Sequence, residues 1–340
     1  MVTFGVGSSP VEPLKKTIWL AKTAELLGFK YFVHADQRFR GERDVYVTLT
    51  AEALNTNEIL LGPCVSDPYS RIPGLQATAI ASLDEVSHGR ALLTLGAGGA
   101  AFKELHLERK RPNIAIREAF YIIKNLLQGE EVTFKGKMFS VTKAKTNLQT
   151  RRDIPIYIAS RSPSNLELAG EIADGAVIAF ASPQLLKDAL EKIGGGARRA
   201  KRTLSDLKLI AWVYTSVSQD SKQAINNVRP FVTQALLNTS PDMYPAMFEG
   251  FKEDVASFLL ACRKNGTEQA AYEDRNYLTD DVVRRFSVAG TPEECVEKLR
   301  DIVQLGIQTI WLRCFSAPYS EVNHEKVLIP FAEQVMPYVK

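Results

Sequence analysis

Two short stretches of the sequence combine residue types that can bind a phosphate group. Ser160, Arg161 and Ser162 stand directly before Pro163. Because proline favours the first turn of a helix, the cation and hydroxyls are expected at a helix N-terminus, where free amides and the helix dipole attract an anion. The second stretch, Gly96-Ala97-Gly98-Gly99, presents backbone N–H groups that few side chains obstruct. Capping of the helix by Ser162 is the alternative, and it is compatible with phosphate binding.

A second group of polar residues ends a short apolar run. It comprises His34, Asp36 and Gln37. Asp36 and Gln37 are candidate catalytic residues that could contact a substrate or a cofactor through hydrogen bonds. A glutamine side chain cannot donate a proton near neutral pH, so it is not a candidate general acid. His34 could serve either the fold or the site.

The apolar run over residues 59–65 has the length of a strand and is interrupted by Gly62-Pro63. Glycine and proline inside a strand favour a bulge or the close approach of a ligand or another backbone, and a plain kink is the alternative. Asp67 and Arg71 follow in the next loop. They could line the mouth of a substrate site, but we favour a structural ion pair of Arg71 with Asp67 or Asp36.

The cysteines and the remaining histidines do not indicate a metal site. The four cysteines have apolar neighbours and no metal-type spacing, which favours buried thiols in a reducing compartment; they are Cys64, Cys262, Cys295 and Cys314. His88 lies in a turn, and His106 has glutamates nearby but no second cluster of ligands. We therefore expect no bound metal, and no catalytic thiol at Cys64 because no base stands near it.

The composition is that of an ordinary globular protein. Of 340 residues, 45% are hydrophobic and 24% are charged, and the net charge is only +3. The densest basic run, residues 198–202, is expected to be a solvated helix face, so nucleic acid is not an expected partner. The N-terminus lacks the features of a signal peptide, and no apolar stretch has spanning length. These features predict a cytoplasmic protein without membrane contact.

The elements that must position the candidate residues form a repeated pattern. Short apolar runs alternate with amphipathic segments, which is typical of βα units and a parallel sheet. Eight such units predict a TIM barrel with insertions, a (β/α)8 fold whose functional residues lie just beyond the C-terminal ends of the strands. The predicted strands are residues 3–6, 30–34, 59–65, 91–95, 154–159, 175–180, 208–217 and 307–314.

Two segments exceed what a βα unit needs. Residues 131–141 contain the turn Lys135-Gly136-Lys137 and predict a hairpin outside the core, and residues 219–285 predict a helical insertion. After them, Thr291 and Pro292 are suited to the N-cap and the first position of a helix. We expect one domain over residues 1–340.

Residues 62–73 and 83–90 resemble the third- and fourth-strand region of the bacterial-luciferase-like flavin oxidoreductases. The similarity extends over nearly the whole chain, with further matches at residues 154–175 and 286–292. It is strongest to the branch typified by methylenetetrahydromethanopterin reductase, which uses the deazaflavin coenzyme F420. In that branch a non-proline cis peptide at the strand end bends the cofactor ring, and the resemblance puts it at Cys64-Val65.

The resemblance also implies the cofactor site and the reaction. Cys64 and Val65 would lie under the ring, and the loops holding Ala97, Gly98, Gly99, Ser160, Arg161 and Ser162 would bind the cofactor phosphate. The branch usually has an Asp-His pair where this chain has Asp36 and Gln37. The implied activity is hydride transfer between coenzyme F420 and a small organic substrate, for which a methylenetetrahydromethanopterin-like compound is one candidate.

Two alternatives remain open at this point. An FMN-dependent monooxygenase on the same barrel would use the same phosphate loops, and a non-catalytic barrel could serve as a partner subunit. The replacement of the usual histidine by Gln37 slightly favours the second alternative, whereas the intact phosphate loops oppose it. The resemblance further implies a homo-oligomer, a dimer or higher, that pairs through helices near residues 44–54.

Overall fold

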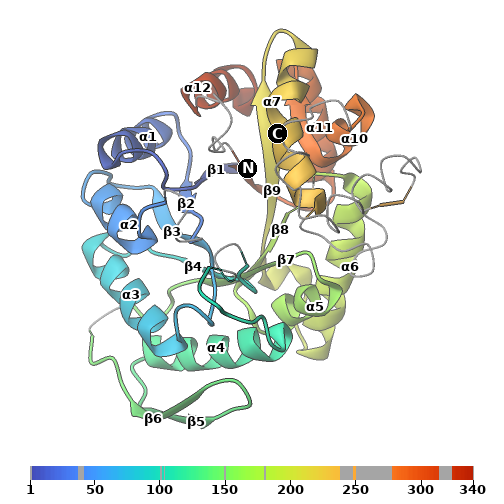
Figure 1. Ribbon diagram of the computed structural model, residues 1–340. Coiled ribbons are helices and arrows are strands. Elements are labelled where there is room, and N and C mark those ends of the chain that lie inside the picture. Colours follow the sequence, from blue (N-terminus) through green and yellow to red (C-terminus); the bar gives the residue numbers. More distant parts are fainter. Residues whose placement is uncertain are drawn as a thin grey trace.

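The structure is a computed structural model, which describes residues 2–36, 42–99, 102, 104–148, 151–179, 181–237, 248–249, 278–313 and 324–339. Within them, eight parallel strands close into a barrel in the order β9-β11-β1-β2-β3-β4-β7-β8, with β9 pairing back to β8 (Figure 1). The TIM barrel predicted from the sequence is therefore confirmed. The strands are β1 (Thr3–Ser8), β2 (Tyr31–His34), β3 (Leu60–Ser66), β4 (Leu93–Leu95), β7 (Ile156–Ser160), β8 (Gly175–Ile178), β9 (Lys208–Val217) and β11 (Thr309–Arg313).

Helices surround the barrel. One stripe of apolar side chains on α4 is buried and comprises Ile116, Phe120, Ile123 and Leu127. At the start of α11, Thr291 accepts from the Glu294 amide and Glu294 accepts from the Thr291 amide, a capping box followed by Pro292. The surrounding helices are α1 (Leu14–Leu26), α2 (Val45–Ala53), α3 (Pro73–Val86), α4 (Pro112–Leu127), α5 (Pro163–Ile172), α6 (Pro183–Arg199), α11 (Pro292–Gln304) and α12 (His324–Gln334), with short 3-10 turns η1 (Leu204–Asp206) and η3 (Met336–Tyr338).

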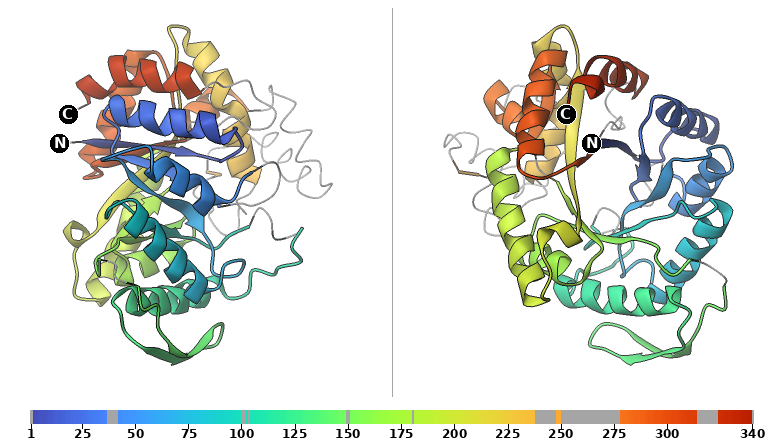
Figure 2. Two further views of the ribbon diagram at one scale, coloured as in Figure 1. Left: turned by 90° about the vertical axis from the view of Figure 1, so that its left-hand side faces the viewer. Right: turned by 180° about the vertical axis from the view of Figure 1, so that it is seen from behind.

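An antiparallel hairpin lies outside the ring of helices, next to α4 (Figure 2). It consists of β5 (Val132–Lys135) and β6 (Ser140–Ala144). Glu118 of α4 holds its turn, because the carboxylate accepts from the amides of Lys137, Met138 and Phe139 at 2.7, 2.9 and 2.9 Å. Burial alone would raise the pKa of Glu118, but these amide hydrogen bonds outweigh it and lower the pKa.

The sequence analysis did not predict the strand β10 (Ser287–Gly290). β10 pairs in parallel with residues 214–217 of β9, beyond the part of β9 that pairs with β8. β9 therefore runs on past the barrel and lies between α7 (Ser221–Leu237) and α12 (Figure 1). Within the predicted insertion over residues 219–285, α7 and α10 (Asp280–Phe286) are helical, and residues 238–247 and 250–277 lie outside the described residues.

The interior of the barrel is filled by side chains. Trp311 is fully buried beside Gly5, where an added Cβ would lie 2.6 Å from the indole, and Trp212 occupies the space that Gly7 leaves free. The other members of this cluster are Tyr31, Val33, Cys64, Leu92, Tyr157, Val177 and Ile210. Because the lumen is packed in this way, a ligand must bind at the rim of the barrel rather than inside it.

Candidate active site at the C-terminal rim of the barrel

The predicted site residues that the structure describes follow four consecutive strands, β2, β3, β4 and β7. Direct contacts connect their ends. The Ser66 hydroxyl at the end of β3 donates to the Asp36 carboxylate after β2, at 2.6 Å, and the Gly96 amide after β4 donates to the Ser66 carbonyl at 2.9 Å. Leu95 at the end of β4 pairs with Ile158 of β7, so the turn after β4 lies beside the end of β7. The barrel thus brings these residues to one part of its rim.

Asp36 is a buried hydrogen-bond acceptor at this rim, with 4% of its surface exposed. Besides Ser66, it accepts from Arg71, whose Nε lies 2.9 Å from Oδ2. Arg71 also donates to Asp44, the N-cap of α2, and its guanidinium lies 5.0 Å from the centre of the Tyr46 ring. The structural ion pair favoured from the sequence is therefore present, with Asp36 as the partner of Arg71.

Arg71 is held in its charged form by the two carboxylates. Burial alone would lower the pKa of Arg71, but the negative charge of Asp36 and the hydrogen bonds to Asp44 and Asp36 raise it well above its ordinary value. Burial alone would raise the pKa of Asp44, but the hydrogen bond from Arg71, the positive charge of Arg71 and the amide hydrogen bonds at the start of α2 together lower it. Asp67 accepts instead from the amides of Tyr69 and Ser70, which fixes the turn after β3.

His34 belongs to the layer between the barrel and the helices. Along β2, Tyr31 and Val33 point into the lumen, so His34 points outward, where its Nε2 lies 2.8 Å from Glu52 of α2. Both side chains are fully buried. Burial raises the pKa of Glu52 despite the opposing influence of His34. Of the two roles left open for His34, the structure supports the structural one, and period-two alternation along the strand could have revealed it.

The peptide bond between Cys64 and Val65 is cis, as the resemblance implied. Cys64 lies in the lumen cluster with 1% of its surface exposed, and burial raises the pKa of its thiol far above the ordinary value. It is therefore not an ionised nucleophile, in agreement with the sequence prediction. Val65 is half-buried and packs against Gly96, where an added Cβ would come within 2.7 Å of the valine Cγ2.

An arginine that was not among the sequence candidates, Arg109, binds the glycine-rich turn after β4. Arg109 donates from Nε to the Ala97 carbonyl at 3.1 Å and from Nη2 to the Gly98 carbonyl at 2.6 Å. Gly98 has a φ of +65°, and a Cβ there would collide with Asp67 and Phe102. The turn therefore requires glycine, and Arg109 adds positive charge where the sequence predicted only backbone amides.

The loop after β7 folds into a compact polar turn at the start of α5. The Ser162 amide donates to Ser160 Oγ at 2.9 Å, and the Ser162 and Ser164 hydroxyls are 3.0 Å apart. Ser162 is the N-cap residue, but its side chain makes no capping bond, so its hydroxyl is not committed to the helix as the alternative reading required. Arg161 is half-buried, and burial lowers the pKa of its guanidinium.

The sequence analysis also named no candidate residues on a second part of the rim, which β9 and β11 form. Arg313 at the end of β11 donates to the Tyr214 hydroxyl at 2.8 Å. Its guanidinium lies 4.9 Å from the centre of the Trp212 ring and 4.7 Å from that of Tyr214. Arg161 also contacts Tyr214 and lies near Arg313. The predicted strand, residues 307–314, includes Arg313, so the rule that functional residues lie just beyond the strand ends did not single it out.

Some of the sequence candidates fall outside this geometry. Gln37, Cys262 and Cys314 lie outside the described residues. Cys295 is a buried free thiol. In the part of the chain that the structure describes, no three His, Cys, Asp or Glu side chains cluster as metal ligands, and no helix is long and apolar enough to cross a membrane.

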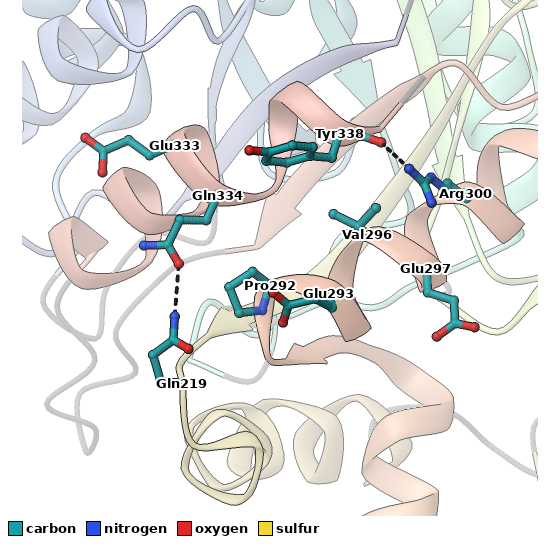
Figure 3. Close-up of a pocket in the computed structure, with 9 residues that line it drawn as sticks. All are labelled: Gln219, Pro292, Glu293, Val296, Glu297, Arg300, Glu333, Gln334 and Tyr338. Atoms are coloured by element: carbon teal, nitrogen blue, oxygen red, sulfur yellow. Dashed lines mark hydrogen bonds between the residues drawn. The ribbon is translucent and has the colours of Figure 1, made fainter.

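A groove of about 640 Å³ lies on the outer surface between α11 and the segment of α12 and η3 (Figure 3). Gln219 bonds Gln334 across one end, and Arg300 donates to the Tyr338 carbonyl at the other. Its remaining lining residues are Pro292, Glu293, Val296, Glu297 and Glu333. None of them belongs to the strand ends that carry the predicted site, so we place the candidate active site at the rim.

Comparison with known proteins identifies the class of this barrel. The family model described as luciferase-like monooxygenase matches residues 2–309. The 5,10-methylenetetrahydromethanopterin reductase of Methanolobus tindarius is 32% identical over 324 residues, which cover 91% of this chain and 93% of the relative. The F420-dependent glucose-6-phosphate dehydrogenase of Nakamurella multipartita is 28% identical, covering 86% and 81%.

A solved structure supports the same assignment. The coenzyme F420 dependent tetrahydromethanopterin reductase from Methanopyrus kandleri superposes with a TM-score of 0.88 at 28% identity, covering 100% of this chain and 99% of that one. The chain belongs to the luciferase-like monooxygenase family. It is an enzyme, an oxidoreductase, and the resemblance to the methylenetetrahydromethanopterin reductase branch is confirmed. A barrel that has lost catalysis is not favoured by these relatives, which are named as enzymes.

Proposed function

We propose that this enzyme transfers a hydride between coenzyme F420 and a small organic substrate. The observation that carries the proposal is that the end of β3, the glycine turn after β4 and the serine-arginine loop after β7 lie on adjacent strands of the barrel. The relatives named as F420-dependent support the choice of cofactor. The FMN alternative is represented by a Baeyer-Villiger monooxygenase structure of 17% identity, a likeness that concerns the fold alone.

The residues present fit a cofactor that has a flat ring and a phosphate. Ser160, Arg161 and Ser162 would bind the phosphate together with the backbone of Ala97, Gly98 and Gly99, and Arg109 adds charge beside that turn. Val65 would lie against the ring, since Val65 and Gly96 form a close-packed apolar surface at the strand end, whereas the Cys64 side chain is buried in the lumen of the barrel. When bound, F420 supplies a deazaflavin ring that accepts or donates the hydride.

Asp36 and Gln37 would contact the substrate or the edge of the ring. Ser66 at the end of β3 and Arg71 in the loop after β3 both donate to Asp36. The Asp36 carboxylate is therefore held in one position, where it can act as a hydrogen-bond acceptor. Such rigidity orients a bound molecule and leaves the hydride step to the cofactor. A methylenetetrahydromethanopterin-like compound is one candidate substrate, because the reductase of Methanolobus tindarius carries that name.

The enzyme is also proposed to form a homo-oligomer through α2 and α3. Large apolar side chains are exposed on and beside these helices: Val47, Leu54, Ile72 and Leu75. Exposed apolar groups of this size favour a protein interface.

The experiment that tests the cofactor is a pair of binding titrations on cofactor-free protein, with coenzyme F420 and with FMN, repeated for Arg161→Ala. We expect F420 to bind more tightly, and Arg161→Ala to weaken F420 about tenfold or more through loss of a charged phosphate contact. A phosphate-free deazaflavin should bind both proteins equally. Arg199→Ala, on the exposed end of α6, is the matched control. Preference for FMN, or no binding of either cofactor, would refute the proposal.

A further inference from the structure

Two guanidinium groups from different strands meet at one phenol on the β7, β9 and β11 side of the rim. Arg313 ends β11 and donates to the Tyr214 hydroxyl at 2.8 Å, and Arg161, which follows β7, makes a side-chain hydrogen bond with the same tyrosine. Residues 161, 214 and 313 are far apart in sequence, so the closed barrel alone brings them together. The result is a concentration of positive charge beside the proposed cofactor site.

Packing fixes this arrangement. The Arg313 guanidinium lies between the rings of Trp212 and Tyr214, at 4.9 and 4.7 Å from their centres, and Tyr214 stacks on Phe231 of α7 with ring centres 6.1 Å apart. Trp212 and Tyr214 are two residues apart on β9, so their side chains point to the same face. Contact with two aromatic faces holds a guanidinium in place.

The polar groups of this cluster are predominantly donors. Arg161 and Arg313 can only donate, and the Tyr214 hydroxyl retains its own proton for donation while it accepts from Arg313. The Trp212 indole Nε1 is buried and has no hydrogen-bond partner among the described residues, although the residue is 7% exposed. A buried donor of this kind is stabilised when an acceptor reaches it. The chemistry complementary to this set is an oxygen-rich anion.

The electrostatics agree with this reading. Burial lowers the pKa of Arg161 and so does the positive charge of Arg313, and the opposing influence of Tyr214 does not cancel these two effects. A bound anion would offset both effects. Bidentate pairing with carboxylate or phosphate oxygens is the interaction for which guanidinium groups are best suited.

We infer that Arg313 and Tyr214, with Arg161 beside them, bind an anionic group of the substrate, a carboxylate or a phosphate. This inference rests on the proposed function, because it assigns the phosphate of the cofactor to the loops after β4 and β7. Arg161 would lie between the phosphate of the cofactor and the anionic group of the substrate, whereas Arg313 would contact only the anionic group of the substrate. The substrate is therefore an acid rather than a neutral molecule, held at the β9 and β11 side of the rim.

The test is calorimetric titration of the protein saturated with oxidised F420, with inorganic phosphate and with succinate as probes and potassium chloride at equal ionic strength as the blank. We expect both probes to bind the wild type. Arg313→Gln should weaken them about tenfold and change F420 affinity less than about twofold. Arg300→Gln, which removes an arginine from the outer groove, should leave both unchanged.

Tyr214→Phe supplies a second variant that keeps the aromatic support of Arg313. It should weaken both probes about threefold or more, because one donor is lost and the guanidinium loses its fixed position. If Arg313→Gln does not fold, Tyr214→Phe still tests whether this cluster binds the anion. No heat above the chloride blank for the wild type would overturn the inference, as would an equal loss of F420 and probe affinity in Arg313→Gln, which would assign Arg313 to the cofactor.

The two proposals can fail separately. If F420 does not bind the wild type, the proposed function is refuted. The inference on the anion site can still be tested, because the same titrations on the cofactor-free protein compare Arg313→Gln with the wild type. Once a hydride acceptor is found, matched pairs of a carboxylic acid and its neutral amide give a second readout. The acid should be preferred by the wild type and lose about tenfold in kcat/KM in Arg313→Gln, with the amide unaffected.

Discussion

The Ser66 hydroxyl donates a 2.6 Å hydrogen bond to the Asp36 carboxylate and thereby joins the end of β3 to the segment after β2. Ser66 is fully buried, and Gln76 of α3 donates to the same hydroxyl at 3.2 Å. One small side chain therefore positions the acceptor that we propose faces the substrate or the ring.

Ser66→Ala should disturb this arrangement without removing Asp36. Loss of the hydroxyl leaves a buried carboxylate with one donor fewer, which should cost about 1–3 kcal/mol in the free energy of unfolding. We also expect kcat with reduced F420 to fall about tenfold while F420 affinity stays within about twofold, because the phosphate loops are untouched. Urea denaturation and steady-state kinetics measure the two effects. Ser140→Ala, in the exposed hairpin, is the control, and equal stability of both variants would contradict the prediction.

Gly96→Ala tests the close packing between β3 and the turn after β4. A Cβ at this position would lie 2.7 Å from Val65 Cγ2, so Val65 must move. We expect a loss of about 1–3 kcal/mol of stability and weaker cofactor binding, since overpacking shifts the surface that the ring would contact. Gly74→Ala is the matched control, because nothing lies within 4 Å of its added Cβ. Thermal unfolding and F420 titration should separate the two variants, and an unperturbed Gly96→Ala would show that Val65 has room to yield.

The strands could be predicted from the sequence because apolar runs and turn residues are local signals. The run at residues 208–217 was found with the bounds that β9 has in the structure. β10 was missed because Ser287–Gly290 is only four residues long and directly precedes the Thr291 cap, which dominated the local pattern. Its partner is the outer half of β9, and no periodicity within four residues indicates such a long-range pairing.

The site was predictable where its residues are neighbours in sequence. Ser160, Arg161 and Ser162 are consecutive, so a common role could be proposed from the sequence, and the family resemblance implied the cis bond. Arg109 and Arg313 act through contacts that only the fold creates: Arg313 binds Tyr214 across 99 positions of the chain, and Arg109 folds back over a turn 11 positions earlier. Charge and composition alone cannot distinguish such an arginine from a solvated one.

The hairpin turn provides a prediction on pH. The pKa of Glu118 is lowered in the folded protein from the ordinary value of 4.5, because amide hydrogen bonds outweigh the opposing effect of burial. As pH falls, the unfolded chain takes up this proton first, so the stability that Glu118 contributes is full above about pH 4.5 and is lost as pH falls through the folded pKa.

Glu118→Gln should therefore cost about 1–2 kcal/mol at pH 7, since a charged acceptor of three amides is replaced by a neutral group with one acceptor. The difference from the wild type should shrink below about pH 4. Urea denaturation across pH 3–7 measures it, with Glu131→Gln, an exposed neighbour, as control. A difference that stayed constant over this range would mean that packing, and not the charge, stabilises the turn.

The proposed homo-oligomer makes its own prediction at α3. Leu75 is 64% exposed, and Val47, Leu54 and Ile72 on or beside α2 and α3 are exposed to a similar degree. If these side chains are covered in an interface, Leu75→Glu buries a charge against apolar groups and should weaken self-association about thirtyfold or more. Sedimentation velocity at micromolar concentration should then show an oligomer for the wild type and mainly monomer for the variant. Tyr338→Glu changes an equally exposed apolar residue on η3 and should leave the oligomer intact, because η3 does not belong to the proposed interface. A wild-type monomer would remove the proposal, and dissociation by Tyr338→Glu alone would move the interface to the opposite end of the chain.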